Sequence, residues 1–146
     1  MSGTLTFEVR RVSTQEEMAG ALALRHEVFC VEQGVPEREE LDGRDRDGIH
    51  LVAIAAGELL GTCRVLMVGT TAQFSRLAVR ASARRRGIAT ALLEAADAET
   101  LAAGGHRLVL HAQTYAQPLY EHAGYRARGR VFVEAGIRHI AMEKRL

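Results

Sequence analysis

The sequence lacks asparagine and contains only two prolines and two cysteines among its 146 residues. Without asparagine there is no acceptor for N-glycosylation. Neither Cys30 nor Cys63 lies in a Cys-x-x-Cys pair or at metal-ligand spacing from a histidine, so we expect reduced, buried thiols, no bound metal and a cytoplasmic location.

No stretch approaches the ~20 apolar residues that span a bilayer, and residues 1–12 alternate between polar and apolar rather than forming a signal-peptide core. We therefore expect no membrane partner.

The charge of the chain is nearly balanced, because 19 basic and 18 acidic residues leave a net charge of +1. This balance gives no general attraction to nucleic acid, and the arginine run lacks the interleaved aromatic residues of single-strand binders. Charge is nevertheless concentrated in two places: residues 37–47 carry six acids and residues 80–86 carry four arginines. The acidic run is typical of a solvated surface, although it would also attract a cationic substrate.

Hydrophobic periodicity predicts strands and helices in a definite order along the chain. Residues 5–10 alternate as in a half-buried strand, and Ser13 and Thr14 open a doubled capping box for a helix that ends at Gly34. Further strands are predicted over residues 49–56, 59–68, 74–79, 108–110, 125–133 and 137–143, and further helices over 87–102 and 115–122. This order predicts an α/β fold in which one mixed sheet is packed by helices, in a single domain of residues 1–146.

The turn before the helix that starts at Gly87 has the features of an anion site. Backbone N–H groups at a helix start have no intrahelical partners, and the helix dipole adds positive potential. Gly87 lacks a Cβ, so the chain can adopt a positive φ and a phosphate can approach closely. The sequence has neither the Gly-Lys pair of a nucleotide-hydrolase P-loop nor the G-x-G-x-x-G dinucleotide fingerprint, so those two phosphate loops are excluded. The residues expected at the site are Arg84, Arg85, Arg86, Gly87, Ile88, Ala89 and Thr90.

Two motifs resemble those of the GNAT acetyltransferases. Arg84-x-x-Gly87-x-Ala89 is similar to the family's Q/R-x-x-G-x-G/A turn, whose amides bind the coenzyme A pyrophosphate. The segment from Gln113 to Tyr125 is similar to the family's N-x-x-A-x-x-(F/L)-Y-x-x-x-G-F segment, with glutamine and tyrosine replacing its Asn and Phe. The resemblance implies a GNAT-like α/β (α+β) fold with a mostly antiparallel sheet of about seven strands flanked by helices, and acetyl-CoA as co-substrate.

The same resemblance implies catalytic roles. In the family the acceptor amine attacks the thioester carbonyl directly, a backbone N–H supports the charge on the carbonyl oxygen, and a tyrosine protonates the departing thiolate. Here the backbone role falls to the strand residues Leu77, Ala78 and Val79, and Tyr120 is expected to be the general acid. The residues expected to contact the coenzyme from the second motif are Gln113, Ala116 and Tyr120.

The acceptor side carries a further resemblance, to the ElaA-like subgroup of GNAT proteins. The segment from Arg25 to Pro36 is similar to that subgroup's R-H-x-V-F-x-x-E-Q-G-x-P signature, and stretches around Arg64 and His139 extend the likeness over nearly the whole chain. The implied acceptor is a primary amine of a small molecule or peptide, which is protonated at neutral pH and therefore needs a base or a water relay. The candidate bases are Glu32 and His50. The residues expected to contact the acceptor are Arg25, Phe29, Glu32 and Arg64.

The sequence is also compatible with two alternatives. A non-catalytic module that senses acyl-CoA would need the phosphate-binding turn but neither Tyr120 nor an acceptor pocket. The acyl-homoserine-lactone synthases share the fold and part of the N-terminal signature, but Gln73 stands where their E-x-S-R motif has its glutamate, and a glutamine cannot act as a base. The chain is also short for that group. Both a monomer and a homodimer are compatible with the sequence.

Overall fold

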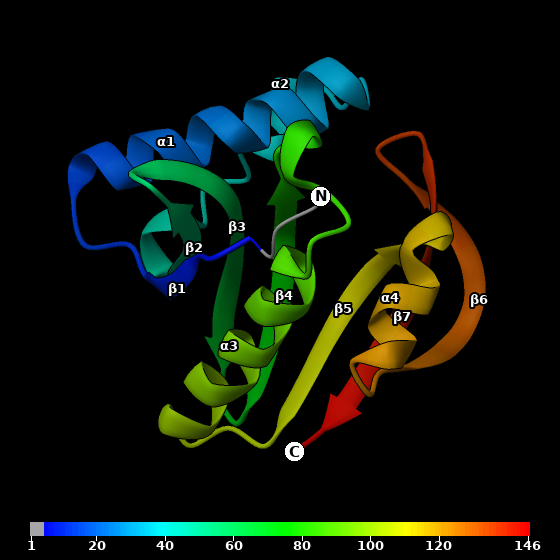
Figure 1. Ribbon diagram of the computed structural model, residues 1–146. Coiled ribbons are helices and arrows are strands. Elements are labelled where there is room, and N and C mark those ends of the chain that lie inside the picture. The colour runs from blue at the N-terminus through cyan, green and yellow to red at the C-terminus, as the bar shows by residue number, and fades with distance from the viewer. Residues whose placement is uncertain (1–4) are drawn as a thin grey trace.

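The computed structural model describes residues 5–146 and contains one seven-stranded sheet (Figure 1). Its strands lie in the spatial order β1 (Glu8–Arg11), β2 (Ile49–Ala55), β3 (Glu58–Val68), β4 (Thr71–Val79), β5 (Arg107–Gln113), β7 (Ile137–Arg145) and β6 (Arg126–Glu134). Within this part of the chain β4 and β5 form the one parallel pair. The α-helices are α1 (Gln15–Arg25), α2 (Glu37–Glu40), α3 (Ile88–Ala102) and α4 (Gln117–His122). The predicted order of elements and the mostly antiparallel sheet are confirmed.

The first helix begins where the capping box predicts and then changes its geometry. The hydroxyl of Thr14 accepts a hydrogen bond of 3.1 Å from the backbone N–H of Glu17. After Arg25 the chain continues as a π-helical segment, His26–Glu32, in which each N–H reaches one residue further back than in an α-helix. This segment ends at Glu32 with Gln33 as its C-cap, and the next residue, Gly34, has φ +72°. The sequence pattern thus gives the extent of this helix correctly but not its wider second half. No helix in residues 5–146 has the length and apolar character needed to cross a membrane.

Helices cover both faces of the sheet. Leu24 and Val28, from α1 and the segment after it, pack against Ala78 on one face. On the other face α3 and α4 contribute Leu92 and Tyr120 to the main core (Figure 1). The contact between α3 and β3 is so close that a Cβ at Gly61 would lie 2.7 Å from Ile88 Cγ2, so this position requires glycine.

Strands β4 and β5 separate soon after they pair. Their register covers only residues 71–73 and 107–109, and beyond it the two strands diverge (Figure 1). On its other edge β4 carries a bulge, because the register with β3 passes from Ser75 to Ala78 and leaves Arg76 and Leu77 without a partner there. Arg76 has φ +59°, a conformation that side chains other than glycine rarely adopt. The sheet is therefore opened in its middle, between the two halves of the molecule.

Candidate functional site

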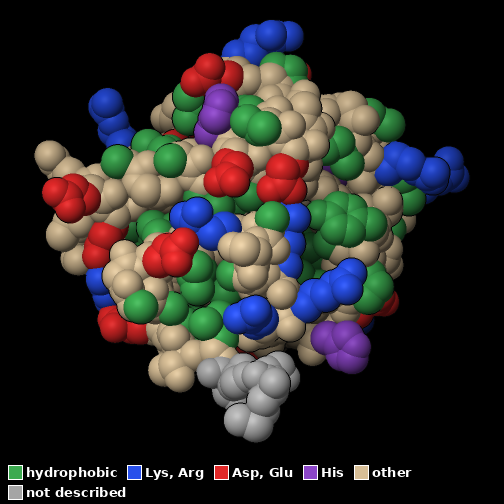
Figure 2. Space-filling view, turned by 45° about the horizontal axis from the view of Figure 1, so that its top comes forward, with side chains coloured by type: hydrophobic (Ala, Val, Ile, Leu, Met, Phe, Trp, Pro, Cys, Tyr) green, Lys and Arg blue, Asp and Glu red, His purple; other side chains and the backbone are tan. Residues whose placement is uncertain are grey.

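A cavity of about 1950 Å³ occupies the opening between β4 and β5. Figure 2 shows one face of the molecule, on which basic and acidic side chains both lie among apolar ones. Most residues expected at the site line the cavity, and they come from the segment after α1, from β3 and β4, from the start of α3 and from the region of α4. These residues are Phe29, Glu32, Arg64, Leu77, Val79, Arg84, Arg85, Gly87, Ile88, Ala89, Thr90, Gln113, Ala116 and Tyr120.

Four expected residues lie outside the cavity lining: Arg25, His50, Ala78 and Arg86. Ala78 faces the other way because side chains alternate along a strand, and it packs against α1. His50 lies on β2, and its Nε2 is 2.7 Å from the carbonyl oxygen of Asp45, so the imidazole is engaged with the backbone of a neighbouring loop. The position of His50 is therefore incompatible with direct contact to a substrate in this cavity.

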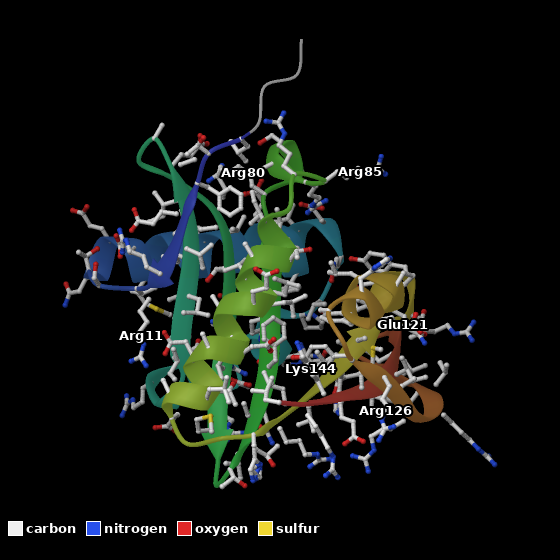
Figure 3. All side chains as sticks on the ribbon, turned by 60° about the horizontal axis from the view of Figure 1, so that its bottom comes forward. Arg11, Arg80, Arg85, Glu121, Arg126 and Lys144 are labelled. Carbon is white, nitrogen blue, oxygen red and sulfur yellow. The ribbon has the colours of Figure 1, made fainter. Side chains whose placement is uncertain are left out.

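The turn before α3 presents free backbone N–H groups to the cavity. Gly87 has φ +86° and is the N-cap residue of α3, and no side chain caps this helix. Arg85 also has a positive φ, +63°, and its side chain extends outward from the turn (Figure 3). A Cβ at Gly87 would point into open space, so the glycine is required by its backbone conformation and leaves the approach to the helix start unobstructed. Such a turn followed by a helix N-terminus is well suited to bind an anion.

Arg84 joins the turn to the opposite wall of the cavity. Its Nε donates to the carbonyl of Val79 at 3.0 Å, and its Nη2 lies 2.9 Å from the Glu32 carboxylate. The Glu32 side chain is 35% exposed. Glu32, one of the two bases expected from the sequence, thus pairs with Arg84 and ties the segment after α1 to the turn before α3.

Tyr120 lies at the inner wall of the cavity and is only 8% exposed. Its ring meets the edges of Phe74 and Tyr125 at interplanar angles of 75°. Burial raises the pKa of the Tyr120 hydroxyl well above its usual range, and the nearby Tyr115 and Cys63 act in the same direction. The hydroxyl is therefore protonated at neutral pH and can serve as a proton donor.

The acidic run does not form a free negative surface, because three of its acids are paired with arginines from other elements. Arg25, which is 1% exposed, binds Glu40 at 2.5 Å and Asp45 at 2.8 Å. Arg64 binds Asp42 at 2.8 Å and Asp45 at 2.9 Å. Arg76 pairs with two of the same acids, at 3.4 Å from the carboxylate of Glu40 and 3.3 Å from that of Asp42.

We call these three arginines and three acids the ion-pair cluster. It fastens the loop before β2 onto the bulge of β4. The sequence-based expectation that Arg25 touches the acceptor is at odds with its position, because its guanidinium is enclosed by Glu40 and Asp45. Arg64 is only 2% exposed and is held in the same way, although it borders the cavity.

Several cavity residues were not identified from the sequence. One of them is Gln33, which accepts a hydrogen bond of 2.8 Å from the expected residue Gln113 and links the segment after α1 to the end of β5. On the far wall the cavity is lined by His111, Glu134 and His139, which come from β5, β6 and β7. Only the pairing of these three distant strands brings them together, so no local sequence signal marks them.

The two cysteines are free, and their environments disfavour a reactive thiolate. Complete burial raises the pKa of Cys63 far above its usual range, and burial together with Glu40 and Glu37 raises that of Cys30. In residues 5–146 no group of three or more His, Cys, Asp or Glu side chains is arranged to hold a metal ion.

Comparison with known proteins gives consistent matches over almost the whole chain. Residues 9–146 match the family model of the acetyltransferase (GNAT) domain. The N-acetyltransferase YjcF of Bacillus subtilis (strain 168), whose name records it as uncharacterized, is 32% identical over 131 residues, which cover 89% of this chain and 94% of that protein. Among solved structures, an acyl-CoA N-acyltransferase from Pseudomonas aeruginosa is 33% identical with a TM-score of 0.81, covering 96% of this chain and 99% of that chain. The structure of Escherichia coli ElaA matches with a TM-score of 0.85 at 23% identity, and the match covers 95% of this chain and 99% of that chain.

More distant structures share the fold alone. An aminoglycoside 6'-N-acetyltransferase complexed with coenzyme A has a TM-score of 0.77 at 17% identity, covering 94% of this chain and 96% of that chain. This neighbour shows that a protein with the same fold has been solved with coenzyme A bound.

Proposed function

Because this chain belongs to the GNAT acetyltransferase family, we propose that it is a single-domain N-acetyltransferase that moves an acetyl group from acetyl-CoA to a primary amine of a small molecule or peptide. One observation carries the proposal: the uncapped start of α3 and the buried Tyr120 open into the same cavity between the separated strands β4 and β5. An anion site and a proton donor in one cleft are what the transfer of an acyl group from coenzyme A requires.

The residues at the start of α3 fit the coenzyme. The N–H groups of Ile88, Ala89 and Thr90 belong to the first turn of the helix and have no intrahelical partner, so they can donate to pyrophosphate oxygens. The exposed guanidinium of Arg85 adds positive charge beside them. The separation of β4 from β5 leaves strand edges free on both sides of the cleft, where an extended chain such as the pantetheine arm can be bound by backbone groups.

The bulge and Tyr120 supply the two chemical roles. Leu77 has no register partner in β3 or β5, so its N–H is available to stabilise the negative charge that develops on the thioester carbonyl oxygen. Tyr120 keeps its proton at neutral pH and donates it to the departing thiolate. The ion-pair cluster holds the bulge and the loop before β2 in fixed positions around the acceptor.

The test combines coenzyme binding with turnover. Calorimetry should detect acetyl-CoA binding, and free-thiol release should depend on an amine from a panel of polyamines, lysine peptides and amino sugars, the last suggested by the aminoglycoside-modifying neighbour. Binding without release on any amine would favour an acyl-CoA sensor. An absence of binding would contradict the assignment of the turn at Gly87.

Removal of the Tyr120 hydroxyl should separate binding from chemistry. In Tyr120→Phe we expect kcat to fall by about 10²-fold, the usual effect of losing a general acid, while the Kd for acetyl-CoA stays the same. The aromatic packing against Phe74 and Tyr125 is retained in this variant, so the melting temperature serves as the control. An unchanged kcat would remove Tyr120 from the mechanism.

A further inference from the structure

The wall of the cavity opposite α1 holds a histidine–carboxylate pair. Nδ1 of His111 on β5 lies 3.2 Å from Oε1 of Glu134 on β6. His139 on β7 approaches the other oxygen of this carboxylate, with Nε2 3.9 Å from Oε2. The ring of Phe132 packs against both imidazoles. It lies edge-on to His111, with 5.0 Å between the ring centroids, and stacks on His139, with 5.9 Å between the centroids. Three strands therefore hold one carboxylate between two oriented imidazoles.

The hydrogen bond fixes which nitrogen of His111 is free. A carboxylate oxygen can only accept, so Nδ1 of His111 must donate to Glu134. In the neutral ring the lone pair then lies on Nε2, which is free to accept a proton from a substrate. The His111 side chain is 54% exposed and lines the cavity, so Nε2 can be reached by a substrate.

His139 differs from His111 in accessibility. Its Nδ1 donates to the carbonyl oxygen of Ile137 at 2.7 Å, and its side chain is only 9% exposed. It belongs to β7, which is one strand further from the opening than β5. The remaining charged side chain on this row of the sheet is Arg128, which is paired with Glu143 at 3.2 Å.

His111 and Tyr120 lie on opposite faces of β5. Side chains alternate along the strand, and Leu110 and Ala112 join the core cluster that contains Tyr120. His111 and Gln113 point to the other face, and Gln113 meets Gln33 from the segment that follows α1. A nucleophile that enters beside His111 therefore approaches the cleft from the face of β5 opposite to the proton donor, so the base and the acid occupy separate positions.

We propose that His111, oriented by Glu134, is the general base that deprotonates the acceptor amine. The inference rests on the proposed transferase function. Nε2 of His111 takes one proton from the ammonium group and later releases it to solvent. The freed amine nitrogen forms the bond to the thioester carbonyl carbon as the carbon–sulfur bond breaks. The second proton lost by this nitrogen balances the one that Tyr120 gives to the thiolate, so the products are an amide, a thiol and one released proton.

The test is the variant His111→Asn, whose side-chain amide can still donate to Glu134 but has no nitrogen in the Nε2 position. With the amine of the panel that turns over fastest, we expect kcat/KM at pH 7 to fall by about 10²-fold. The difference between the two rates should shrink about tenfold per pH unit above pH 7, because the fraction of unprotonated amine rises as the pH approaches the pKa of the amine, which is about 10.4 for a lysine side chain. The pH profile of kcat/KM should differ between His111→Asn and the wild-type protein, and the Kd for acetyl-CoA should not change. His106→Asn is the matched control, because His106 is exposed and lies outside the cavity.

A second measurement does not depend on turnover. Two-dimensional ¹⁵N NMR of the neutral imidazoles should show His111 with its proton on Nδ1, and the opposite tautomer would overturn the proposal. A wild-type pH profile in His111→Asn would also overturn it, as would a profile that is lost in His139→Asn and retained in His111→Asn. If the wild-type protein turns over no amine at all, the proposed function fails as well, which distinguishes that outcome from failure of the base assignment alone.

Discussion

Two groups of arginines lie on different sides of the cavity, and they differ in almost every physical respect. Arg84, Arg85 and Arg86 surround the start of α3 and are exposed to solvent. Arg25 and Arg64 are 1% and 2% exposed, and they are enclosed with carboxylates in the ion-pair cluster. In the exposed group Arg84 is paired with Glu32, and the guanidiniums of Arg85 and Arg86 face solvent, whereas the enclosed group is already neutralised by buried or half-buried carboxylates. A count of arginines in the sequence cannot separate these roles, because burial and partners decide them.

The comparison predicts different responses to the same kind of substitution. Removing an enclosed arginine leaves a buried carboxylate uncompensated, which affects folding. Removing an exposed arginine changes only the potential around the turn before α3, where we propose that the coenzyme binds, so it should affect ligand binding. Variants on the two sides should therefore change different observables.

The largest effect on stability is expected from Arg25→Met. Glu40, which is 4% exposed, would retain only the longer contact to Arg76, so the free energy of unfolding should fall by about 3 kcal/mol. Urea titration at pH 7 measures this change. Arg85→Met is the control and should change the free energy of unfolding by no more than about 0.5 kcal/mol. Equal losses in the two variants would contradict the distinction between the groups.

The partner of Arg25 offers a sharper form of this test. In Arg25→Met/Glu40→Leu the buried charge is removed together with its counter-ion, so most of the lost stability should return. Asp45 and Arg76 keep other partners in this double variant, namely Arg64 and Asp42. A double variant as unstable as Arg25→Met alone would mean that packing, rather than charge, explains the loss.

On the other side of the cavity, Gly87→Glu should abolish most coenzyme binding. A carboxylate at the start of α3 would occupy the approach to the free N–H groups and repel phosphate, so the Kd for acetyl-CoA should rise on the order of 100-fold. Calorimetry measures this directly.

Gly87→Ala separates the charge from the backbone effect. With φ at +86° any side chain is strained by about 1 kcal/mol, so both variants should lose similar stability. A Cβ here meets no other atom within 4 Å, so alanine should weaken binding much less than glutamate does. Equal affinities in the two variants would contradict the placement of the phosphate groups.

The proposed phosphate side of the cavity was predictable because its signals are local. Gly87 and the helix that follows it are contiguous in sequence, and the structure places them as expected at the start of α3. The capping box at Thr14 and the alternation of the strands are equally local, and the corresponding elements appear at nearly the expected positions. Residues 1–4 of the expected domain lie outside the described part of the chain.

The acceptor side was less predictable because its geometry depends on distant pairings. The bulge at Arg76 and the π-helical turn after Arg25 arise from packing, not from a sequence motif. The candidate base His50 points away from the cavity, since a neighbouring loop binds its imidazole. His111 lies just beyond the strand predicted over residues 108–110, and only the register of β5 with β7 and β6 reveals its partner Glu134.

The smallest predicted effect concerns the exposed edge of the ion-pair cluster at low pH. The hydrogen bonds from Arg64 hold the pKa of Asp42 below its usual range, although partial burial opposes this shift. The pKa of Asp42 is lower in the folded protein than in the unfolded chain, where it is about 3.9. Ionised Asp42 therefore stabilises the folded state fully above about pH 3.9, and this stabilisation is lost as the pH falls below that value. The difference in unfolding free energy between the wild-type protein and Asp42→Asn should therefore be constant from about pH 7 to pH 5 and shrink below about pH 3.9. Asp47→Asn, at an exposed position outside the cluster, should show no such convergence in urea titrations, and convergence in both variants would mean that general acid unfolding explains the trend.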